Sequence, residues 1–183
     1  MLPDESSSVN FLWGKIFTAV HIALADLKNT RGITNIAVSF PEYGDTSLGT
    51  KLRILAEDEH LLEILDIKGV LHRFADYADI GRIKKIPYNK IKGYAVYSRY
   101  QPDSSVHQKA RRYSQRHPDT SYEQALQIMK SKNRATQLPY IQMCSMTNRN
   151  PFRLFIKRTK AEPGEKYHFG SYGLSPHSAV PEF

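Results

Sequence analysis

The sequence has 183 residues, of which 40% are hydrophobic and 24% charged, so it can bury a core in one large domain or two small ones. Cys144 is the only cysteine, which excludes an intrachain disulfide and a cysteine-based zinc site. No apolar run approaches the roughly 18 residues of a membrane-spanning helix, and residues 1–8 lack the basic and apolar regions of a secretion signal. We therefore expect a cytoplasmic protein without a membrane segment.

The net charge of +8 is distributed unevenly along the chain. Residues 1–81 carry 7 basic and 12 acidic residues, residues 82–117 carry 10 basic residues and one acid, and residues 118–183 carry 9 basic and 5 acidic residues. A strongly basic middle segment beside an acidic first half indicates a surface for a polyanion. Tyrosines interleaved with the cations favour nucleic acid over a membrane, because bases offer flat faces for stacking. These tyrosines are Tyr88, Tyr94, Tyr97, Tyr100 and Tyr113.

Apolar spacing and turn residues predict most of a ferredoxin-like unit in the first half of the chain. The order helix, strand, strand, helix, strand matches a split β-α-β arrangement whose first strand is missing or shortened. The sequence thus predicts an α+β fold with a ferredoxin-like domain over residues 1–97 and a second domain over 98–183. The expected elements are a helix from Ser6, Ser7 or Ser8 to about Lys28, strands at 33–40 and 50–56, a helix at 58–66, and strands at 82–86 and 93–100.

The most basic stretch, residues 105–117, predicts a helix with a cationic face. It contains four basic residues and no acid. Burying unpaired guanidinium groups in a core costs several kcal/mol each, whereas cations about one turn apart suit a row of phosphates. The alternative is an ordinary solvated surface helix. The predicted face consists of Gln108, Arg111, Arg112 and Gln115, with Lys109 and Arg116 beside it.

The rest of the chain predicts one more helix and three strands. The helix is expected over residues 120–132, with a capping box formed by Thr120 and Glu123. Two strands, at 139–143 and 152–158, form a hairpin around the turn at 146–151, and a last strand is expected at 167–173.

Metal-free RNA cleavage needs a proton acceptor for a 2′-hydroxyl, a group that orients this hydroxyl, and cations at the phosphate. Histidine is the natural acceptor at neutral pH. Among seven histidines, none has the spacing of a zinc motif, and the basic region nearly lacks the acids of a magnesium site, so we expect no metal and no cofactor. His21 lies at the margin of the first apolar stripe, where a packing role is the alternative. Ser145 and Thr147 offer hydroxyls at the hairpin turn, where local backbone capping is the alternative.

Several motifs together resemble the CRISPR repeat-processing endoribonucleases of type I-F systems. The resemblance covers nearly the whole chain in the same order. The motifs are HIAL at 21–24, AVSFP at 37–41, LGTKLRI at 48–54, Arg99 with Gln101 before a basic helix, Ser145 with Thr147, FRLFI at 152–156 and YGLS at 172–175.

The resemblance implies a ferredoxin-like domain followed by an RNA-hairpin-binding domain whose basic helix, at about 104–117, enters the major groove of a repeat hairpin. It implies no cofactor. By the same resemblance His21 is the catalytic histidine, Ser145 and Thr147 orient the 2′-hydroxyl, and Tyr172 positions the histidine. The RNA-binding set comprises Arg99 and Gln101 at base edges, Arg111, Arg112 and Arg116 on stem phosphates or a loop base, Gln108, Lys109 and Gln115 on the same helix, Phe152 stacked on a terminal base, and Asn148 and Arg149 in the turn.

The implied partners are the repeat RNA and the other subunits of a type I-F surveillance complex, with a monomer when free. Two alternatives stay open beside the endoribonuclease. One is a hairpin-binding cap subunit without turnover, because His21 lies six residues after Lys15 of the pair Gly14 and Lys15, farther than is common in the resembled family, which leaves Phe17 as the alternative residue in the catalytic register. The other is a general basic adaptor for ribosomal or transfer RNA, which needs only the charge pattern.

Overall fold

The computed structural model describes residues 9–101, 106–132, 137–165 and 167–183. By their internal contacts they form two compact units, one from Met1–Tyr100 with Leu138–Phe183 and the other from Gln101–Gln137. None of the helices in the described residues has the length and apolar character needed to cross a membrane.

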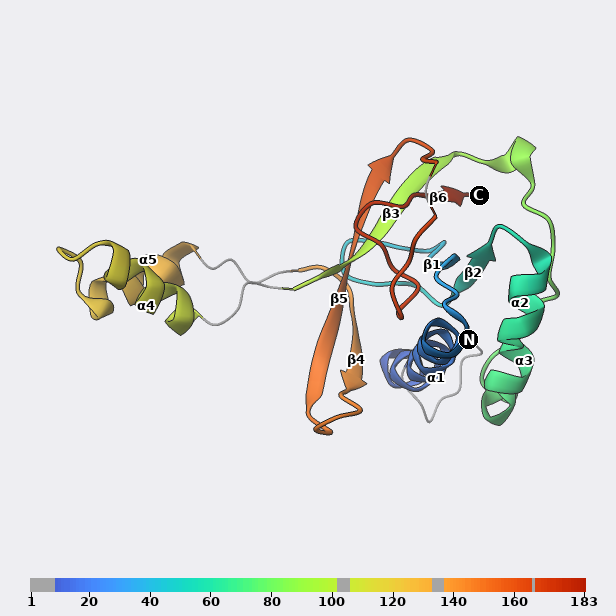
Figure 1. The fold of residues 1–183 in the computed structure, drawn as a ribbon, viewed down its shortest axis with the longest axis horizontal. Helices are drawn as coiled ribbons and strands as arrows, with labels where there is room; N and C mark the ends of the chain where they lie inside the picture. The colour runs from blue at the N-terminus through green and yellow to red at the C-terminus, as the bar shows by residue number, and fades with distance from the viewer. Residues whose placement is uncertain (1–8, 102–105, 133–136, 166) are drawn as a thin grey trace. The chain divides into compact units, whose positions relative to one another are not determined.

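The first unit contains a long helix, α1 (Val9–Arg31), and two antiparallel sheets (Figure 1). The small sheet pairs β1 (Ile36–Ser39) with β2 (Arg53–Ala56). The large sheet has the order β4-β5-β3-β6. Its strands are β3 (Gly93–Tyr100), β4 (Tyr140–Cys144), β5 (Pro151–Ala161) and β6 (Val180–Glu182), and the short helices of the unit are α2 (Glu59–Leu65), α3 (Ile67–Val70), η1 (His72–Phe74) and η2 (Tyr88–Lys90).

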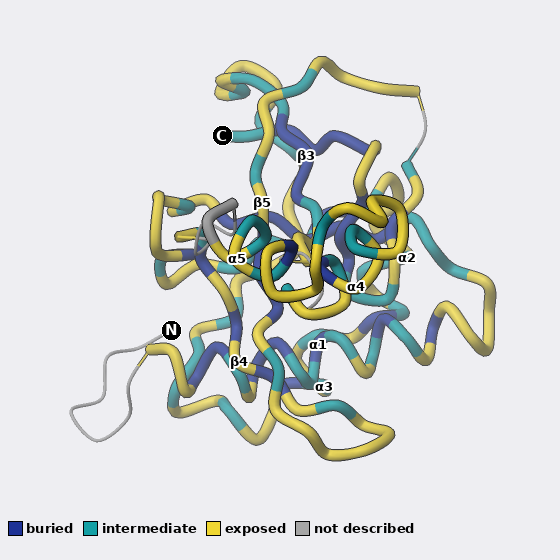
Figure 2. Tube along the Cα trace, turned by 90° about the vertical axis from the view of Figure 1, so that its left-hand side faces the viewer, coloured by how far each residue is buried: buried dark blue, intermediate teal, exposed yellow. Residues whose placement is uncertain are grey.

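The core of the first unit forms between the apolar stripe of α1 and the strands. Residues at helical spacing on α1, among them Trp13, Phe17 and Val20, are buried, and each such side chain contributes about 1.5–3 kcal/mol relative to exposure. They pack in one cluster with Ile141 of β4 and Ile156 of β5. Figure 2 shows dark-blue buried segments along α1 and β3.

Helix α1 approaches β4 so closely that only glycine fits at the crossing. A Cβ atom on Gly14 would lie 2.6 Å from the carbonyl oxygen of Gln142. This contact fixes the helix against the strand that leads into the predicted hairpin turn, because any larger residue would force the two backbones apart.

The second unit is a helix pair, α4 (Val106–Arg116) and α5 (Tyr122–Lys132). Ala110 and Ala125 are both fully buried between the helices, because alanine lets two helix backbones approach closely. His107 Nδ1 and the Tyr122 hydroxyl also form a hydrogen bond of 2.8 Å across the pair. The unit therefore has a small apolar contact surface and a large polar exterior.

The α+β class is confirmed, and most expected elements are present in the structure. The expected first-half helix, the strands at 33–40, 50–56 and 93–100, and the basic helix correspond to α1, β1, β2, β3 and α4. The ferredoxin-like arrangement itself stays a prediction. The expected loss of the first strand and the capping by Ser6, Ser7 or Ser8 concern residues 1–8, which lie outside the described residues, as do residues 104–105 of the expected basic helix.

Two expected strands and one expected cap are wrong. Residues 82–86 form no strand, because a β-strand requires a neighbour for its backbone hydrogen bonds and no described strand pairs with this segment. Residues 167–173 form a loop and turn, whose amide groups donate to Thr34, to Ser178 and to carbonyl oxygens of the turn instead of to a neighbouring strand. The capping box of α5 lies one residue later than expected, with reciprocal bonds between Ser121 and Gln124.

The sequence missed β6, which pairs with the start of β3. The strand has only three residues, one of them a proline, so it is too short to show the alternation of apolar and polar residues that predicts a strand. The division of the chain into one domain over residues 1–97 and another over residues 98–183 stays a prediction.

Candidate functional site

His21 lies on α1, half-buried, with its ring fixed in two ways. Its Nδ1 atom is 2.9 Å from the backbone carbonyl oxygen of Ser171. A carbonyl oxygen only accepts hydrogen bonds, so Nδ1 carries the proton and, in the neutral ring, Nε2 keeps a lone pair. The imidazole also stacks on Tyr172, with 4.0 Å between ring centroids and 10° between ring planes. A histidine held in this tautomer is ready to accept a proton at Nε2.

Tyr172 is held in place by a tight turn that lies against β1. The Gly173 amide donates to the Gly170 carbonyl oxygen, and the Gly173 carbonyl accepts from the Val38 amide at 2.9 Å. Gly173 has a φ of +66°, and a Cβ atom there would lie 2.7 Å from Val38 Cγ1. Because both the backbone angle and the space require glycine, the position of the Tyr172 ring is built into the turn.

Arg99 and Phe152 extend this arrangement along the large sheet. The guanidinium carbon of Arg99 lies 5.7 Å from the centroid of the Tyr172 ring and 5.8 Å from that of Phe152. Arg99 is paired with Ile156, which shares a face of β5 with Phe152 because side chains alternate along a strand. We call His21, Tyr172, Arg99 and Phe152 the aromatic cluster. It combines a proton acceptor, a cation and two faces suited to stacking.

Phe17, the alternative to His21 in the motif register, also contacts this cluster. Its ring is parallel to Tyr172, with 6.5 Å between centroids and 4° between planes. Its side chain is fully buried and carries no titratable group. Phe17 therefore supports the tyrosine from the core side but cannot accept a proton.

Ser145, Thr147, Asn148 and Arg149 all lie in the turn between β4 and β5. The hydrogen bonds of Ser145 that the structure describes are local. Its amide donates to the Asn150 carbonyl at 2.9 Å, its carbonyl accepts from the Arg149 amide at 2.9 Å, and its hydroxyl accepts from the Asn148 amide at 3.5 Å. Arg149 has a φ of +55°. Thr147, Asn148 and Arg149 are exposed. The local capping expected as an alternative for the Ser145 hydroxyl is thus present.

The turn is connected to the aromatic cluster through the strands that it joins. Phe152 follows the turn and is paired with Met143, two residues before Ser145. The paired strands thus connect the hydroxyl-bearing turn to the edge of the cluster.

The predicted cationic face is present on α4. Arg111, Arg112, Gln115 and Arg116 are exposed, as is Gln108, while Lys109 is partly buried. Ala110, which packs toward α5, lies on the opposite side of the helix, because residues 111, 112 and 115 are rotated away from it. We call Gln108, Lys109, Arg111, Arg112, Gln115 and Arg116 the cationic face.

The structure thus brings four of the predicted residues together, His21, Tyr172, Arg99 and Phe152, and places the others, apart from Gln101, in the turn and on α4. Gln101 is exposed and belongs to the helix-pair unit. Sequence reasoning missed the Ser171 carbonyl, because a backbone acceptor leaves no sequence signal. It also missed that Phe17 supports Tyr172. Within the described ranges, no group of three or more His, Cys, Asp or Glu side chains is arranged to hold a metal ion.

Comparison with known proteins assigns the chain to a family of CRISPR proteins. The family model described as CRISPR-associated protein (Cas_Csy4) matches residues 1–183. The chain therefore belongs to the Csy4 family of CRISPR-associated proteins, which confirms the resemblance seen in the motifs.

Two curated relatives are similar over nearly their whole length, and both are named CRISPR-associated endonuclease Cas6/Csy4. The relative from Escherichia coli (strain UTI89 / UPEC) is 31% identical over 186 residues, covering 100% of this chain and 96% of the relative. The relative from Pseudomonas aeruginosa (strain UCBPP-PA14) is 30% identical over 184 residues, covering 99% of this chain and 95% of the relative.

Proposed function

We propose that this protein is an endoribonuclease that binds the stem-loop of a CRISPR repeat and cuts the precursor RNA there. The observation that carries the proposal is the geometry of His21, whose Nδ1 donates to the Ser171 carbonyl while its ring stacks on Tyr172. The names of the two curated relatives support the same class of activity.

In the proposed reaction, Nε2 of His21 accepts the proton of a 2′-hydroxyl, and the 2′-oxygen attacks the adjacent phosphorus. The bond from phosphorus to the 5′-oxygen breaks, and this oxygen takes a proton. The products are a 2′,3′-cyclic phosphate and a 5′-hydroxyl. Ser145 and Thr147 orient the attacking hydroxyl, and Tyr172 is a positioning residue for the imidazole. The reaction needs no metal and no cofactor.

Binding of the hairpin uses the remaining predicted residues. The cationic face of α4 contacts stem phosphates, with Asn148 and Arg149 adding contacts from the turn. Arg99 and Gln101 read base edges, since arginine pairs with guanine and glutamine with adenine. Phe152 stacks on a terminal base. The protein stays bound to the 3′ hairpin of the mature guide as a cytoplasmic subunit of the type I-F surveillance complex and is a monomer when free.

A cleavage assay in excess chelator tests the proposal. The full chain is incubated with its repeat RNA in EDTA, and the product ends are identified. We expect turnover, with a 2′,3′-cyclic or 3′-phosphate on one fragment and a 5′-hydroxyl on the other. A 5′-phosphate on the product would contradict attack by the 2′-hydroxyl, and cleavage that needs added metal would contradict the metal-free reaction.

A second function, a hairpin-binding cap without turnover, is favoured by the buried phenylalanine at position 17. If the histidine of the family pattern has been replaced there, the stacked Phe17–Tyr172 pair is a structural remnant of the site. Tight and selective binding of the repeat hairpin with no cleavage under any condition would support this second function. Equal binding of hairpin, duplex and single strand would favour the general RNA adaptor.

A further inference from the structure

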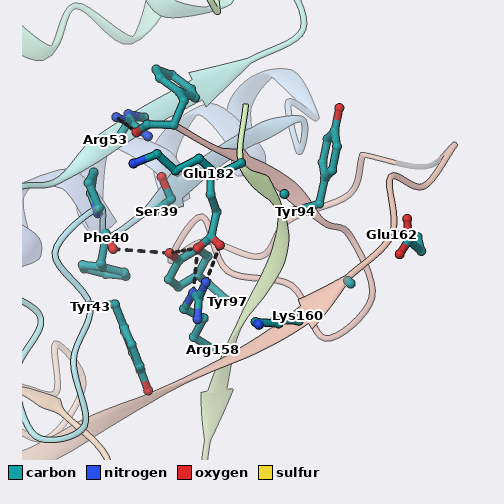
Figure 3. A pocket seen from close by; sticks show the side chains of 15 residues that line it. Ser39, Phe40, Tyr43, Arg53, Tyr94, Tyr97, Arg158, Lys160, Glu162 and Glu182 are labelled. Atoms are coloured by element: carbon teal, nitrogen blue, oxygen red, sulfur yellow. Dashed lines mark hydrogen bonds and ion pairs between the residues drawn. The ribbon is translucent and has the colours of Figure 1, made fainter. Parts of the chain in front are cut away.

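A cavity in the first unit shares no residue with the aromatic cluster. It has a volume of about 680 Å³, within the range of small-molecule sites. Its walls come from the end of β1, from β2, from the first half of β3, from β5 and from β6 (Figure 3). The polar and aromatic side chains that line it include Ser39, Arg53, Lys92, Tyr94, Tyr97, Arg158, Lys160, Glu162, Glu182 and Phe183.

The carboxylate of Glu182 in this cavity is fully engaged by its neighbours. Oε1 accepts from Arg158 Nε at 2.6 Å and from the Tyr97 hydroxyl at 2.7 Å, and Oε2 accepts from the other arm of Arg158 (Figure 3). The hydrogen bond from Arg158 lowers the pKa of Glu182 below its ordinary value, so the pair is ionised at neutral pH. Arg158 and Glu182 thereby neutralise each other, and neither sets the net charge of the cavity.

The remaining charges leave the cavity cationic. Lys92 and Lys160 are exposed at its walls, and Arg53 reaches it from β2, against the single remaining acid, Glu162. Arg53 is fixed, because it donates to the Phe183 carbonyl at 2.8 Å and its guanidinium lies 3.7 Å from the centre of the Phe183 ring. A concave wall with this excess of positive charge attracts an anion.

One buried hydroxyl in the cavity has no partner among the described residues. Ser39 is only 2% exposed, and its Oγ makes no hydrogen bond there. Leaving such a group unpaired costs about 1–3 kcal/mol, so native proteins rarely keep one without a use. Figure 3 shows the Ser39 side chain in the cavity on the same side as Arg53. A donor in this position suits an anionic oxygen that enters from outside.

We propose that this cavity binds a nucleotide phosphate. The lysines and the Ser39 hydroxyl contact the phosphate, and the Tyr94 ring or the Arg53–Phe183 stack contacts the base. The cavity is larger than a bare phosphate needs, and its aromatic walls favour a nucleotide over an acidic peptide. The ligand is either a free nucleotide or one residue of an RNA strand, which share this chemistry. The proposal does not depend on the cleavage reaction, since binding is measured with a mononucleotide.

The test is an NMR titration of the ¹⁵N-labelled full chain with AMP, followed through the amide signals of Gly93 and Tyr94. We expect these signals to shift with AMP, and to shift less with adenosine or with inorganic phosphate alone. Lys92→Gln combined with Lys160→Gln should weaken AMP binding about tenfold or more, as loss of charged hydrogen bonds does. The matched control is Lys157→Gln, which removes an exposed lysine of β5 outside the cavity and should bind AMP normally.

Ser39→Ala tests whether the unpaired Ser39 hydroxyl binds a ligand or is only a defect in packing. If Oγ serves a ligand, AMP affinity falls about tenfold while the melting temperature stays or rises, because an unpaired buried hydroxyl is removed. Unchanged AMP affinity in Ser39→Ala or in the double lysine variant overturns the proposal, as do AMP shifts confined to α4. A tetra-aspartate peptide that shifts Gly93 at lower concentration than AMP also overturns it, in favour of a protein partner.

A second ligand distinguishes a free nucleotide from a residue of an RNA strand. An RNA tetranucleotide without terminal phosphates that shifts Gly93 and Tyr94 as strongly as AMP assigns the cavity to an RNA strand. If AMP alone shifts them, the ligand is a free nucleotide. Because these signals report on the cavity and not on cleavage, they are read whether or not the protein cuts RNA.

Discussion

The aromatic cluster and the cationic face of α4 hold their side chains in opposite ways. In the cluster, His21 is fixed by a backbone carbonyl and a ring stack, and Tyr172 by a turn that requires glycine. On α4, five of the six residues of the cationic face are exposed, and the helix is anchored mainly by the burial of Ala110. A reaction rate depends steeply on the position of the reacting groups, whereas the electrostatic attraction between cations and phosphates persists when the side chains move. The two regions should therefore separate reaction rate from affinity.

The largest effect should come from His21→Ala. Loss of a general base lowers the rate about 10²–10⁴-fold, whereas hairpin affinity should stay within a few-fold because the stem contacts come from other residues. Single-turnover cleavage and filter binding measure the two quantities. His60→Ala, an exposed histidine on α2, is the matched control and should cleave normally. Cleavage by His21→Ala close to the wild-type rate would assign the proton acceptor to another residue.

Arg111→Ala combined with Arg112→Ala should lower the affinity for the hairpin and leave the cleavage rate nearly unchanged, the reverse of His21→Ala. Affinity for the hairpin falls, and the slope of log K against log salt becomes shallower by roughly 2, about 0.9 for each lost phosphate contact with duplex. The cleavage rate at saturating protein should change little. The control, Lys68→Ala combined with Arg73→Ala, removes the same charge from exposed positions on the first unit. An unchanged salt slope in the α4 variant would exclude phosphate contacts by these arginines.

Phe152 should show a smaller and mixed effect, because it is only half-buried and also packs against the core. Phe152→Ala loses base stacking, worth about 1–3 kcal/mol, and lowers the melting temperature. Phe152→Leu keeps most of the apolar packing but offers no ring. A leucine variant with normal stability and weakened RNA binding supports stacking. Normal binding per folded molecule in both variants would leave Phe152 as a core residue.

The smallest effect concerns Glu182, at the other end of β3 from Arg99. Its pKa in the folded protein is lowered, first by the hydrogen bond from Arg158, so its contribution to stability is fully present above its ordinary pKa of 4.5 and is lost as pH falls below it. Glu182→Gln should therefore melt at a lower temperature than wild type at pH 7, and this difference should shrink below pH 4.5. A difference that is constant with pH would show that the carboxylate charge is not what stabilises the fold.

Periodic patterns in the sequence predicted the elements whose structure is set by interactions within the same segment. The apolar stripe of α1 and the charge pattern of α4 both appear as expected, because helices form from local hydrogen bonds. Residues 82–86 have strand-like composition but form no strand, since the partner needed for pairing is not in their own sequence. The capping box moved from Thr120 to Ser121 because adjacent Thr and Ser are equivalent candidates for a cap.

The candidate site was predictable only in part. Motif resemblance selected His21, Tyr172 and Arg99, which the structure brings together. The contact that fixes the imidazole could not be foreseen, because Ser171 is 150 residues from His21 and contributes only its main chain.

The bond from His21 to the Ser171 carbonyl has a consequence for which substitutions the protein can accept. Every amino acid brings a carbonyl to position 171, so a change of side chain there leaves the acceptor of the Nδ1 proton in place. Position 173 has no such freedom, because only glycine combines a φ of +66° with the lack of space beside Val38. The tautomer of the histidine is thus protected against mutation at the residue that it contacts and exposed to mutation two residues further along the chain.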